Sequence, residues 1–283
     1  MLTEEQKQFY DDNGYVVVRG LLTPEEAALY RKETHALAER LSRQRDIDST
    51  WGSANTVTEK KTSLLHCHDV QFQSAAFSRL LVDERMTSVA ADIIGPNVQL
   101  HHTKMFIKPP EKGSPFPMHQ DAPFFPHDNH SMIAVIIHFD DAPLEKGCVR
   151  VVPGSYKLGM LEHEPEGSWH LPPEQYSVED AVPIEAKAGD AVFFSYLTIH
   201  GSGLNVSNEA RTTLLIQMRD PSDPPTIRTH ESRGQGMMLH GIDPTCAVNA
   251  PGWTDPPPAD SVPMGKAEVM GGMAMGSAMG GKM

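Results

Sequence analysis

The stretch FFSYLTIHGSGLNVSNEARTTLLIQ, residues 193–217, has the pattern of two β-strands separated by a loop. Apolar and β-branched residues fill both ends, whereas Gly, Asn and Ser fill the middle. The first strand is predicted to end near His200 and the second to start at about Arg211. In an antiparallel hairpin the second strand returns beside the first, so the pattern predicts that Arg211 lies close to His200.

Similar short apolar runs occur from about residue 98 to 220 and are separated by Pro, Gly, Asn and Asp. They are VQLHHTKMFIKPP, SMIAVIIHFDD, GCVRVVPGSY, AVPIEAKAGDAVFFSYLTIHGSG and ARTTLLIQMRD. Many short strands between turn signals are typical of an all-β barrel or sandwich. We therefore expect a mainly β fold, with a barrel of about eight strands.

Helices are predicted before this region, over about residues 1–95. Thr3 and Thr23 have the character of N-caps, Pro24 suits the first helical position, and acidic residues follow both threonines. The run YVVVRG between these two helices is β-branched and predicts a strand. A third helix is expected over about 76–94, ending at GPN. We expect one domain over 1–250 and a low-complexity, disordered tail over 251–283.

Composition limits the classes of partner. The 283-residue chain has a formal net charge of −13, which argues against nucleic acid and anionic membranes because both are bound by clustered Lys and Arg. The three cysteines are far apart and show no CxxC spacing, so neither disulfides nor a zinc knuckle is indicated. With an acidic N-terminus and no long apolar run, a cytoplasmic location is expected. The oligomeric state stays open.

The segment FPMHQDAPFFPH, residues 116–127, has the character of a site rim, because prolines stiffen it and aromatic residues flank polar ones. On an extended backbone His119 and Asp121 point to one face and can meet one ion. Two histidines and a carboxylate form the facial triad of non-haem Fe(II) oxygenases. A second HxD pair, His138-Phe139-Asp140, ends an apolar strand, and we favour a structural role for it.

His200 and Arg211 supply the remaining features. His200 is the distant histidine that the triad requires, and Ser202 lies two residues beyond it. Arg211 offers a guanidinium fork that fits a carboxylate in bidentate fashion. A metal ligand beside a carboxylate clamp suits an organic acid that chelates the metal at one end and is held at the other.

The pattern His119-x-Asp121, His200-Gly-Ser202 and Arg211 resembles that of the phytanoyl-CoA dioxygenase (PhyH) family of Fe(II)/2-oxoglutarate-dependent oxygenases. The stretches FYDDNGYVVVRGLLTPEE, KPP before HQD and LEKGCVRVVPGSY are also similar to that family, and the likeness covers about residues 5–220. It implies a double-stranded β-helix (jelly-roll, cupin-like) barrel that binds Fe(II), 2-oxoglutarate and O2. The implied reaction is hydroxylation of a C–H bond in a small molecule, with release of succinate and CO2.

The resemblance also implies residue roles. His119, Asp121 and His200 would hold the iron, and Arg211 and Ser202 would orient 2-oxoglutarate. Further cosubstrate contacts are expected from Lys104, from Gln120, and from His66 or His68. Because Asp121 is present, hydroxylation is favoured over halogenation. Ile137 stands where many members have a tryptophan, so one pocket wall differs. Phe124, Phe125 and Trp169 are candidates for the substrate site.

Two other interpretations remain. One is a cupin-like barrel that binds a small molecule without catalysis. The other is a zinc-type barrel enzyme, although zinc chemistry needs no arginine clamp for a cosubstrate. A serine hydrolase is disfavoured because the chain has no G-x-S-x-G motif. The substrate itself is not encoded in a recognisable pattern.

Overall fold

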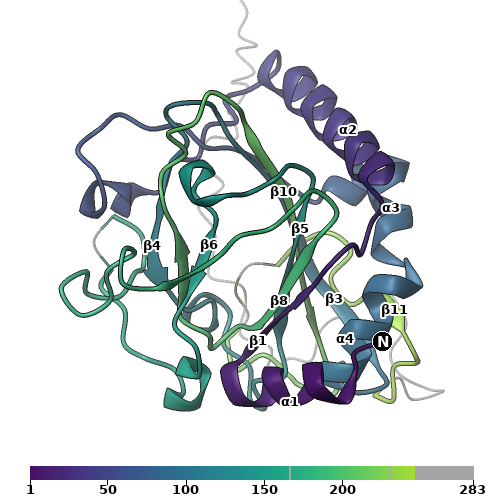
Figure 1. The fold of residues 1–283 in the computed structure, drawn as a ribbon. Helices are drawn as coiled ribbons and strands as arrows, with labels where there is room; N and C mark the ends of the chain where they lie inside the picture. Colours follow the sequence, from purple (N-terminus) through teal and green to yellow (C-terminus); the bar gives the residue numbers. More distant parts are fainter. Residues whose placement is uncertain (166, 228, 230, 246–283) are drawn as a thin grey trace, which may run out of the picture. The chain divides into compact units, whose positions relative to one another are not determined.

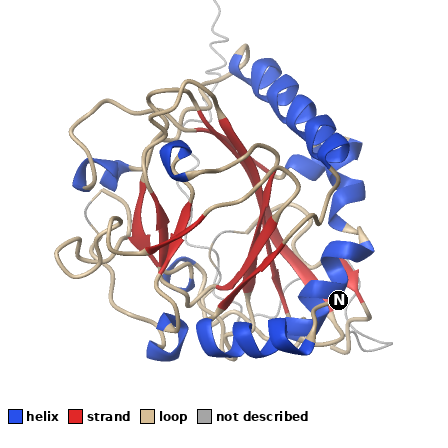
Figure 2. Cartoon of the chain, in the orientation of Figure 1, coloured by secondary structure: helices blue, strands red, loops and turns tan. Residues whose placement is uncertain are grey.

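The computed structural model describes residues 1–165, 167–227, 229 and 231–245. Within residues 1–245, which form one compact unit, two antiparallel β-sheets face each other (Figures 1 and 2). The mainly β, jelly-roll class expected from the sequence is confirmed. The predicted tail over 251–283 lies outside the described residues.

The larger sheet has seven strands in the order β1-β8-β5-β10-β3-β11, with β2 also paired to β3. Its strands are β1 (Tyr15–Val18), β2 (Leu65–His68), β3 (Val98–Lys108), β5 (Ile133–His138), β8 (Ala191–Ser195), β10 (Arg211–Arg219) and β11 (Met238–His240). The smaller sheet has four strands in the order β4-β9-β6-β7. They are β4 (Phe116–His119), β6 (Val149–Val151), β7 (Val182–Ile184) and β9 (His200–Ser202).

Four α-helices are described, and α2, α3 and α4 lie along the outer face of the larger sheet (Figure 1). They are α1 (Glu4–Asn13), α2 (Pro24–Ser42), α3 (Ala75–Leu81) and α4 (Glu84–Ile94). Both predicted N-caps are confirmed: the Thr3 side chain accepts a hydrogen bond from the Gln6 amide and that of Thr23 from the Glu26 amide. These capping boxes fix where α1 and α2 begin.

Alternation along β10 explains how one strand serves two layers. Leu214, Ile216 and Met218 are buried in the core between the larger sheet and the helices. Their neighbours Thr213 and Leu215 point to the other face, toward the smaller sheet. Because side chains alternate in a strand, β10 presents an apolar face to the helices and a mixed face to the interior between the sheets.

Several predicted elements differ from the structure. The third helix is two helices, because Asp83 caps a new helix after α3 ends at Leu81. Eight of the eleven described strands, β3 to β10, lie within the predicted barrel range of about 98–220, as expected, whereas β2 and β11 were not predicted. The predicted hairpin is also wrong: β9 pairs with β4 and β6, whereas β10 pairs with β3 and β5. The loop between β9 and β10 therefore crosses from one sheet to the other.

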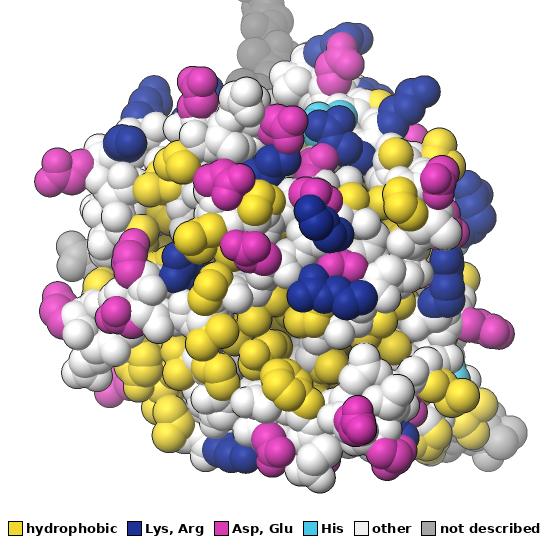
Figure 3. All heavy atoms as spheres, viewed as in Figure 1, with side chains coloured by type: hydrophobic (Ala, Val, Ile, Leu, Met, Phe, Trp, Pro, Cys, Tyr) yellow, Lys and Arg dark blue, Asp and Glu magenta, His cyan; other side chains and the backbone are white. Residues whose placement is uncertain are grey.

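Charges of both signs occur on the described surface. On the face in Figure 3, acidic and basic side chains are interspersed, and no single-sign patch covers the face. Among the described residues no helix has both the length and the apolar character needed to cross a membrane.

Candidate active site

Two neighbouring strands of the smaller sheet bring the histidines of the HxD motif and the HGS motif together. His119 at the end of β4 is paired in register with His200 at the start of β9, and their ring centroids are 4.2 Å apart. The side-chain ligand atoms of His119, Asp121 and His200 all lie within 4.8 Å of one another. The three residues that the sequence analysis selected therefore form one cluster.

Asp121 reaches this cluster by a route that the sequence analysis did not predict. It lies beyond the end of β4, with φ −76° and ψ −27°, at the start of a short 3-10 helix, Ala122–Phe124. Its amide donates to the Tyr196 carbonyl (2.9 Å). A turn held by this bond, rather than an extended backbone, directs the carboxylate toward the histidines.

The hydrogen bonds of both histidines leave Nε2 free for a metal. His119 Nδ1 lies 2.8 Å from the Pro117 carbonyl, and His200 Nδ1 lies 3.0 Å from the Thr198 carbonyl. A carbonyl only accepts, so each neutral ring carries its hydrogen on Nδ1 and a lone pair on Nε2. Backbone carbonyls commonly orient metal-binding histidines in this way.

The carboxylate of Asp121 lies opposite these lone pairs. Its Oδ1 is 3.8 Å from Nε2 of both His119 and His200, and its Oδ2 accepts a hydrogen bond from Gln217 Nε2 (2.7 Å). Burial raises the pKa of Asp121, and burial followed by the charge of His200 lowers the pKa of His119. The donor set of two imidazole nitrogens and one carboxylate oxygen fits Fe(II) and leaves positions for other ligands.

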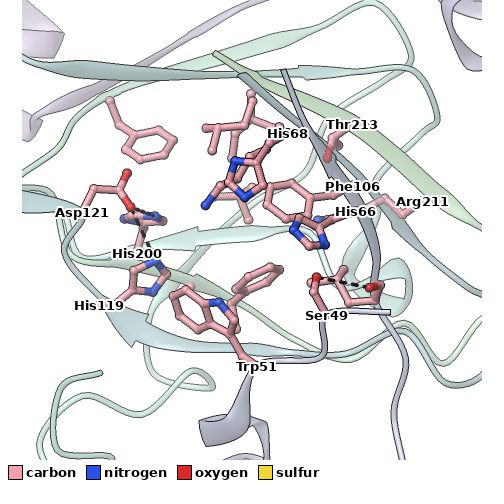
Figure 4. Close-up of a pocket in the computed structure, with 18 residues that line it drawn as sticks. Ser49, Trp51, His66, His68, Phe106, His119, Asp121, His200, Arg211 and Thr213 are labelled. Carbon is pink, nitrogen blue, oxygen red and sulfur yellow. Dashed lines mark hydrogen bonds and ion pairs between the residues drawn. The ribbon is translucent and has the colours of Figure 1, made fainter. Parts of the chain in front are cut away.

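The triad borders a cavity of about 230 Å³ between the two sheets (Figure 4). Nine of its eighteen lining residues are polar or charged, and apolar residues, aromatic ones among them, make up the rest. Its lining residues are Ser49, Trp51, Leu64, His66, His68, Lys104, Phe106, Phe116, His119, Asp121, Ile136, Val149, Phe194, His200, Gly201, Arg211, Thr213 and Leu215. Enclosure by apolar walls strengthens electrostatic interactions inside the cavity.

Arg211 lies at the opposite end of this cavity from the triad (Figure 4). The residue is only 3% exposed, its Nη1 donates to the Gly147 carbonyl, and its buried Nε has no partner. Burial lowers the pKa of the guanidinium to about 10. Because Arg211 has no ion pair with a carboxylate among the described residues, it is free to pair with an anion from solution.

Ser202 is buried next to Gly201, a lining residue, but does not itself line the cavity. Its hydroxyl accepts a hydrogen bond from Lys108 Nζ (2.8 Å), which also donates to the Gly203 carbonyl (2.6 Å). Lys108 is fully buried and lies opposite Arg211 in the β3–β10 pairing. Burial lowers the pKa of Lys108, and the charge of Arg211 adds to that effect.

Of the remaining predicted contacts, Lys104, His66 and His68 all line the cavity. Gln120 does not. Its Nε2 donates to the carbonyls of Gly159 and Leu197, and its Oε1 accepts from the Leu161 amide. Gln120 thus ties neighbouring loops together, because the turn after His119 points it away from the cavity, and this placement does not support cosubstrate binding.

Three residues of the site were not predicted from the sequence. Lys108 and Gln217 support Ser202 and Asp121, and Trp51 packs on His119 with ring centroids 4.5 Å apart. Lys108 is part of the quoted KPP motif, which was a signal. Trp51 lies in a polar, irregular segment and gave none.

Two of the aromatic candidates, Phe124 and Trp169, form a row with Trp51, whereas Phe125 is buried; none of the three candidates lines the cavity. Phe124 lies 6.0 Å from Trp51 and 5.5 Å from Trp169, between ring centroids. The second HxD pair lies elsewhere: His138 is fully buried on β5, and neither ring nitrogen has a hydrogen-bond partner. Its position outside the cavity lining agrees with a structural role.

The family model "Phytanoyl-CoA dioxygenase (PhyH)" matches residues 10–213. A peroxisomal phytanoyl-CoA dioxygenase of Bos taurus is 28% identical over 237 residues, covering 78% of this chain and 69% of the relative. An ectoine dioxygenase of Stutzerimonas stutzeri is 26% identical over 235 residues, covering 75% of each chain.

Solved structures have the same fold. The epimerase SnoN, crystallised with Fe3+, alpha ketoglutarate and nogalamycin RO, matches with a TM-score of 0.63 and 25% identity, covering 85% of this chain and 96% of its own. The carbocyclase SnoK from nogalamycin biosynthesis has a TM-score of 0.68 at 19% identity, covering 84% and 95%.

A two-histidine, one-carboxylate cluster in a jelly-roll barrel, opposite an unpaired buried arginine, defines the class of non-haem iron, 2-oxoglutarate-dependent dioxygenases. The family model matches residues 10–213, which is most of the chain, and so shows the family within this class. The chain belongs to the phytanoyl-CoA dioxygenase (PhyH) family. Iron, 2-oxoglutarate and O2 are the cofactor and cosubstrates of this class.

Proposed function

We propose that this enzyme hydroxylates a C–H bond of a small organic molecule and converts 2-oxoglutarate to succinate and CO2. One oxygen atom of O2 enters the product and the other enters succinate. The observation that carries this proposal is a single cavity with the metal triad at one end and the unpaired Arg211 at the other. That arrangement suits a dicarboxylic 2-oxo acid.

His119, Asp121 and His200 would hold Fe(II), which supplies activation of O2 when bound. The Nδ1 hydrogen bonds to backbone carbonyls keep both imidazoles pointing at the ion. Arg211 would clamp the far carboxylate of 2-oxoglutarate through its guanidinium fork. Ser202, which accepts a hydrogen bond from Lys108, would support that end of the cavity from behind the lining residues. Trp51 and Phe116 exclude water beside His119.

Hydroxylation is favoured over halogenation because the carboxylate of Asp121 occupies the position that a halide would need. A cavity of about 230 Å³ lies below the range of about 300–1,000 Å³ that is usual for drug-sized ligands. A small molecule, or one small end of a larger one, therefore suits the site. We place the enzyme in the cytoplasm, since Cys67 and Cys148 are free, buried thiols.

An anaerobic titration of metal-free protein with Fe(II) and 2-oxoglutarate tests this function. We expect the weak visible charge-transfer band of a chelated 2-oxo acid in the native protein and its loss in Asp121→Ala. If iron binds and no band forms, Arg211 is not a cosubstrate clamp. A zinc-type or non-catalytic barrel would then be the better account.

A further inference from the structure

Lys104 is a cation in the cavity that the iron and 2-oxoglutarate sites leave unexplained. It lies on β3, opposite His68 of β2 on one side and Leu215 of β10 on the other. It lines the cavity and makes no hydrogen bond or ion pair with any described residue. An ammonium group in this cavity is costly to desolvate unless an anion binds beside it.

Lys104 and Arg211 stand at different ends of the cavity. In the β3–β10 pairing Arg211 is opposite Lys108, whereas Lys104 is opposite Leu215, four residues further along β10. Four residues of a strand extend about 13 Å. Gln217, which donates a hydrogen bond to Asp121, is only two residues from Leu215 on β10, so Lys104 lies nearer the metal end. The carboxylate held by Arg211 is therefore out of reach of Lys104.

The charges of the lining residues also indicate that the cavity has room for a further anion. Fe(II) and 2-oxoglutarate carry equal and opposite charges, so together they add no net charge. Asp121 is the sole acidic residue among the described lining residues, and it offsets one of the two lining cations, Lys104 and Arg211. One positive charge is left over in the loaded site, before the buried Lys108 is considered.

His66 adds a second polar contact at this place. It lines the cavity from β2, stacks on Phe106 with ring centroids 6.3 Å apart, and has a buried Nδ1 with no hydrogen-bond partner. His66 is opposite Phe106 and His68 is opposite Lys104, so Lys104 and His66 are diagonal neighbours on adjacent strands. An ammonium group and an imidazole that face one cavity from neighbouring strands can both donate to an oxyanion.

We propose that Lys104 and His66 bind an oxyanion group of the substrate, a carboxylate or a phosphonate, next to the metal. This inference rests on the function proposed above. It makes the substrate an acid whose oxidised carbon lies close to its anionic group, and it gives Lys104 a role distinct from the cosubstrate contact expected from the sequence. The limited cavity volume restricts this end of the substrate to a small group.

Binding of simple probes tests the proposal. Protein is loaded anaerobically with Fe(II) and saturating 2-oxoglutarate, and is titrated with benzoate, phenylphosphonate and the neutral analogue benzamide. We expect wild-type protein to bind at least one of the anions about tenfold or more tightly than benzamide, the scale of one charge-assisted hydrogen bond. Lys104→Met should lose this preference and keep the charge-transfer band, while Lys104→Arg should retain part of it. Lys112→Met, at an exposed lysine, is the matched control.

Three results would overturn the proposal. The first is wild-type protein that binds benzamide as tightly as both anions. The second is a Lys104→Met variant that keeps the preference for the anion. The third is evidence that Lys104 binds the cosubstrate. Either a tenfold loss of 2-oxoglutarate affinity in Lys104→Met or removal of the charge-transfer band by benzoate would provide it. Absence of the band in wild-type protein is a separate result and refutes the dioxygenase function itself.

Discussion

Gln217 on β10 donates a hydrogen bond to Oδ2 of Asp121 (2.7 Å), and the other carboxylate oxygen faces both histidines at 3.8 Å. This bond links the central part of the larger sheet to the candidate metal triad. It leaves the other oxygen of Asp121 available to a metal. We therefore infer that Gln217 positions the Asp121 carboxylate.

Replacing Gln217 should weaken iron binding without removing a ligand. For Gln217→Leu we expect an Fe(II) affinity about 10- to 100-fold lower, the usual cost of losing a residue that orients a metal ligand. Competition titration against a chromophoric chelator measures it. Gln99→Leu is the control, because Gln99 on β3 is also buried but has no bond to Asp121. Equal losses in the two variants would contradict the positioning role.

Loss of a triad ligand should weaken iron binding more than loss of Gln217 does. In His119→Ala or Asp121→Ala, succinate formation from 2-oxoglutarate should fall to background, because two remaining ligands hold the ion weakly. Metal content after dialysis and succinate release measure both parts of this prediction. Retention of iron-dependent turnover in either variant would show that the metal lies elsewhere.

Arg211→Lys should act on the cosubstrate alone. A lysine keeps the charge but loses the fork, and one lost charge-assisted hydrogen bond costs about 1.5–3 kcal/mol, or about 10- to 150-fold in affinity. We expect the KM for 2-oxoglutarate to rise by such a factor while Fe(II) affinity stays within about twofold of wild type. An unchanged KM would remove Arg211 from the cosubstrate site.

His138 should make stability depend on pH. Burial lowers its pKa from 6.5 to about 3 in the folded protein, with a further contribution from the charge of Arg211. Between these values the unfolded chain binds one more proton than the folded chain. His138 therefore has no effect on the pH dependence of the unfolding free energy above about pH 6.5. Below that pH it makes the unfolding free energy decrease by up to about 1.4 kcal/mol per pH unit.

Urea unfolding of metal-free protein at several pH values from 7 to 4 tests this effect. In His138→Gln the pH dependence of the unfolding free energy should decrease by up to one proton. Identical slopes in His138→Gln and wild type would show that His138 gains a proton while folded.

Gly52 should be intolerant of a side chain. An added Cβ would lie 2.5 Å from the Gly167 carbonyl oxygen, so the two loops would have to separate and move Trp51 from His119. We expect Gly52→Ala to cost about 1–3 kcal/mol, as overpacking does, and to change tryptophan fluorescence. Gly203→Ala is the control, since its Cβ would meet nothing closer than 3.9 Å. Equal stability of the two variants would contradict this account.

Local sequence patterns predicted the starts of two helices and the main residues of the candidate site. The capping threonines Thr3 and Thr23 fixed the starts of two helices, because a cap depends on residues only three positions apart. The spacing of His119, Asp121, His200 and Arg211 indicated a metal site and a carboxylate clamp before any strand pairing was known. Those inferences depended on residue chemistry and on short spacings.

Tertiary structure decided how these residues meet. His200 and Arg211 share a cavity because their strands belong to facing sheets, and not because they form a hairpin. Alternation in a strand fixes which side chains share a face, but the choice of partner strand depends on contacts between residues far apart in the chain. For the same reason Gln217, Lys108 and Trp51 were missed: their partners at the site lie 68 to 96 positions away, beyond the reach of any local pattern.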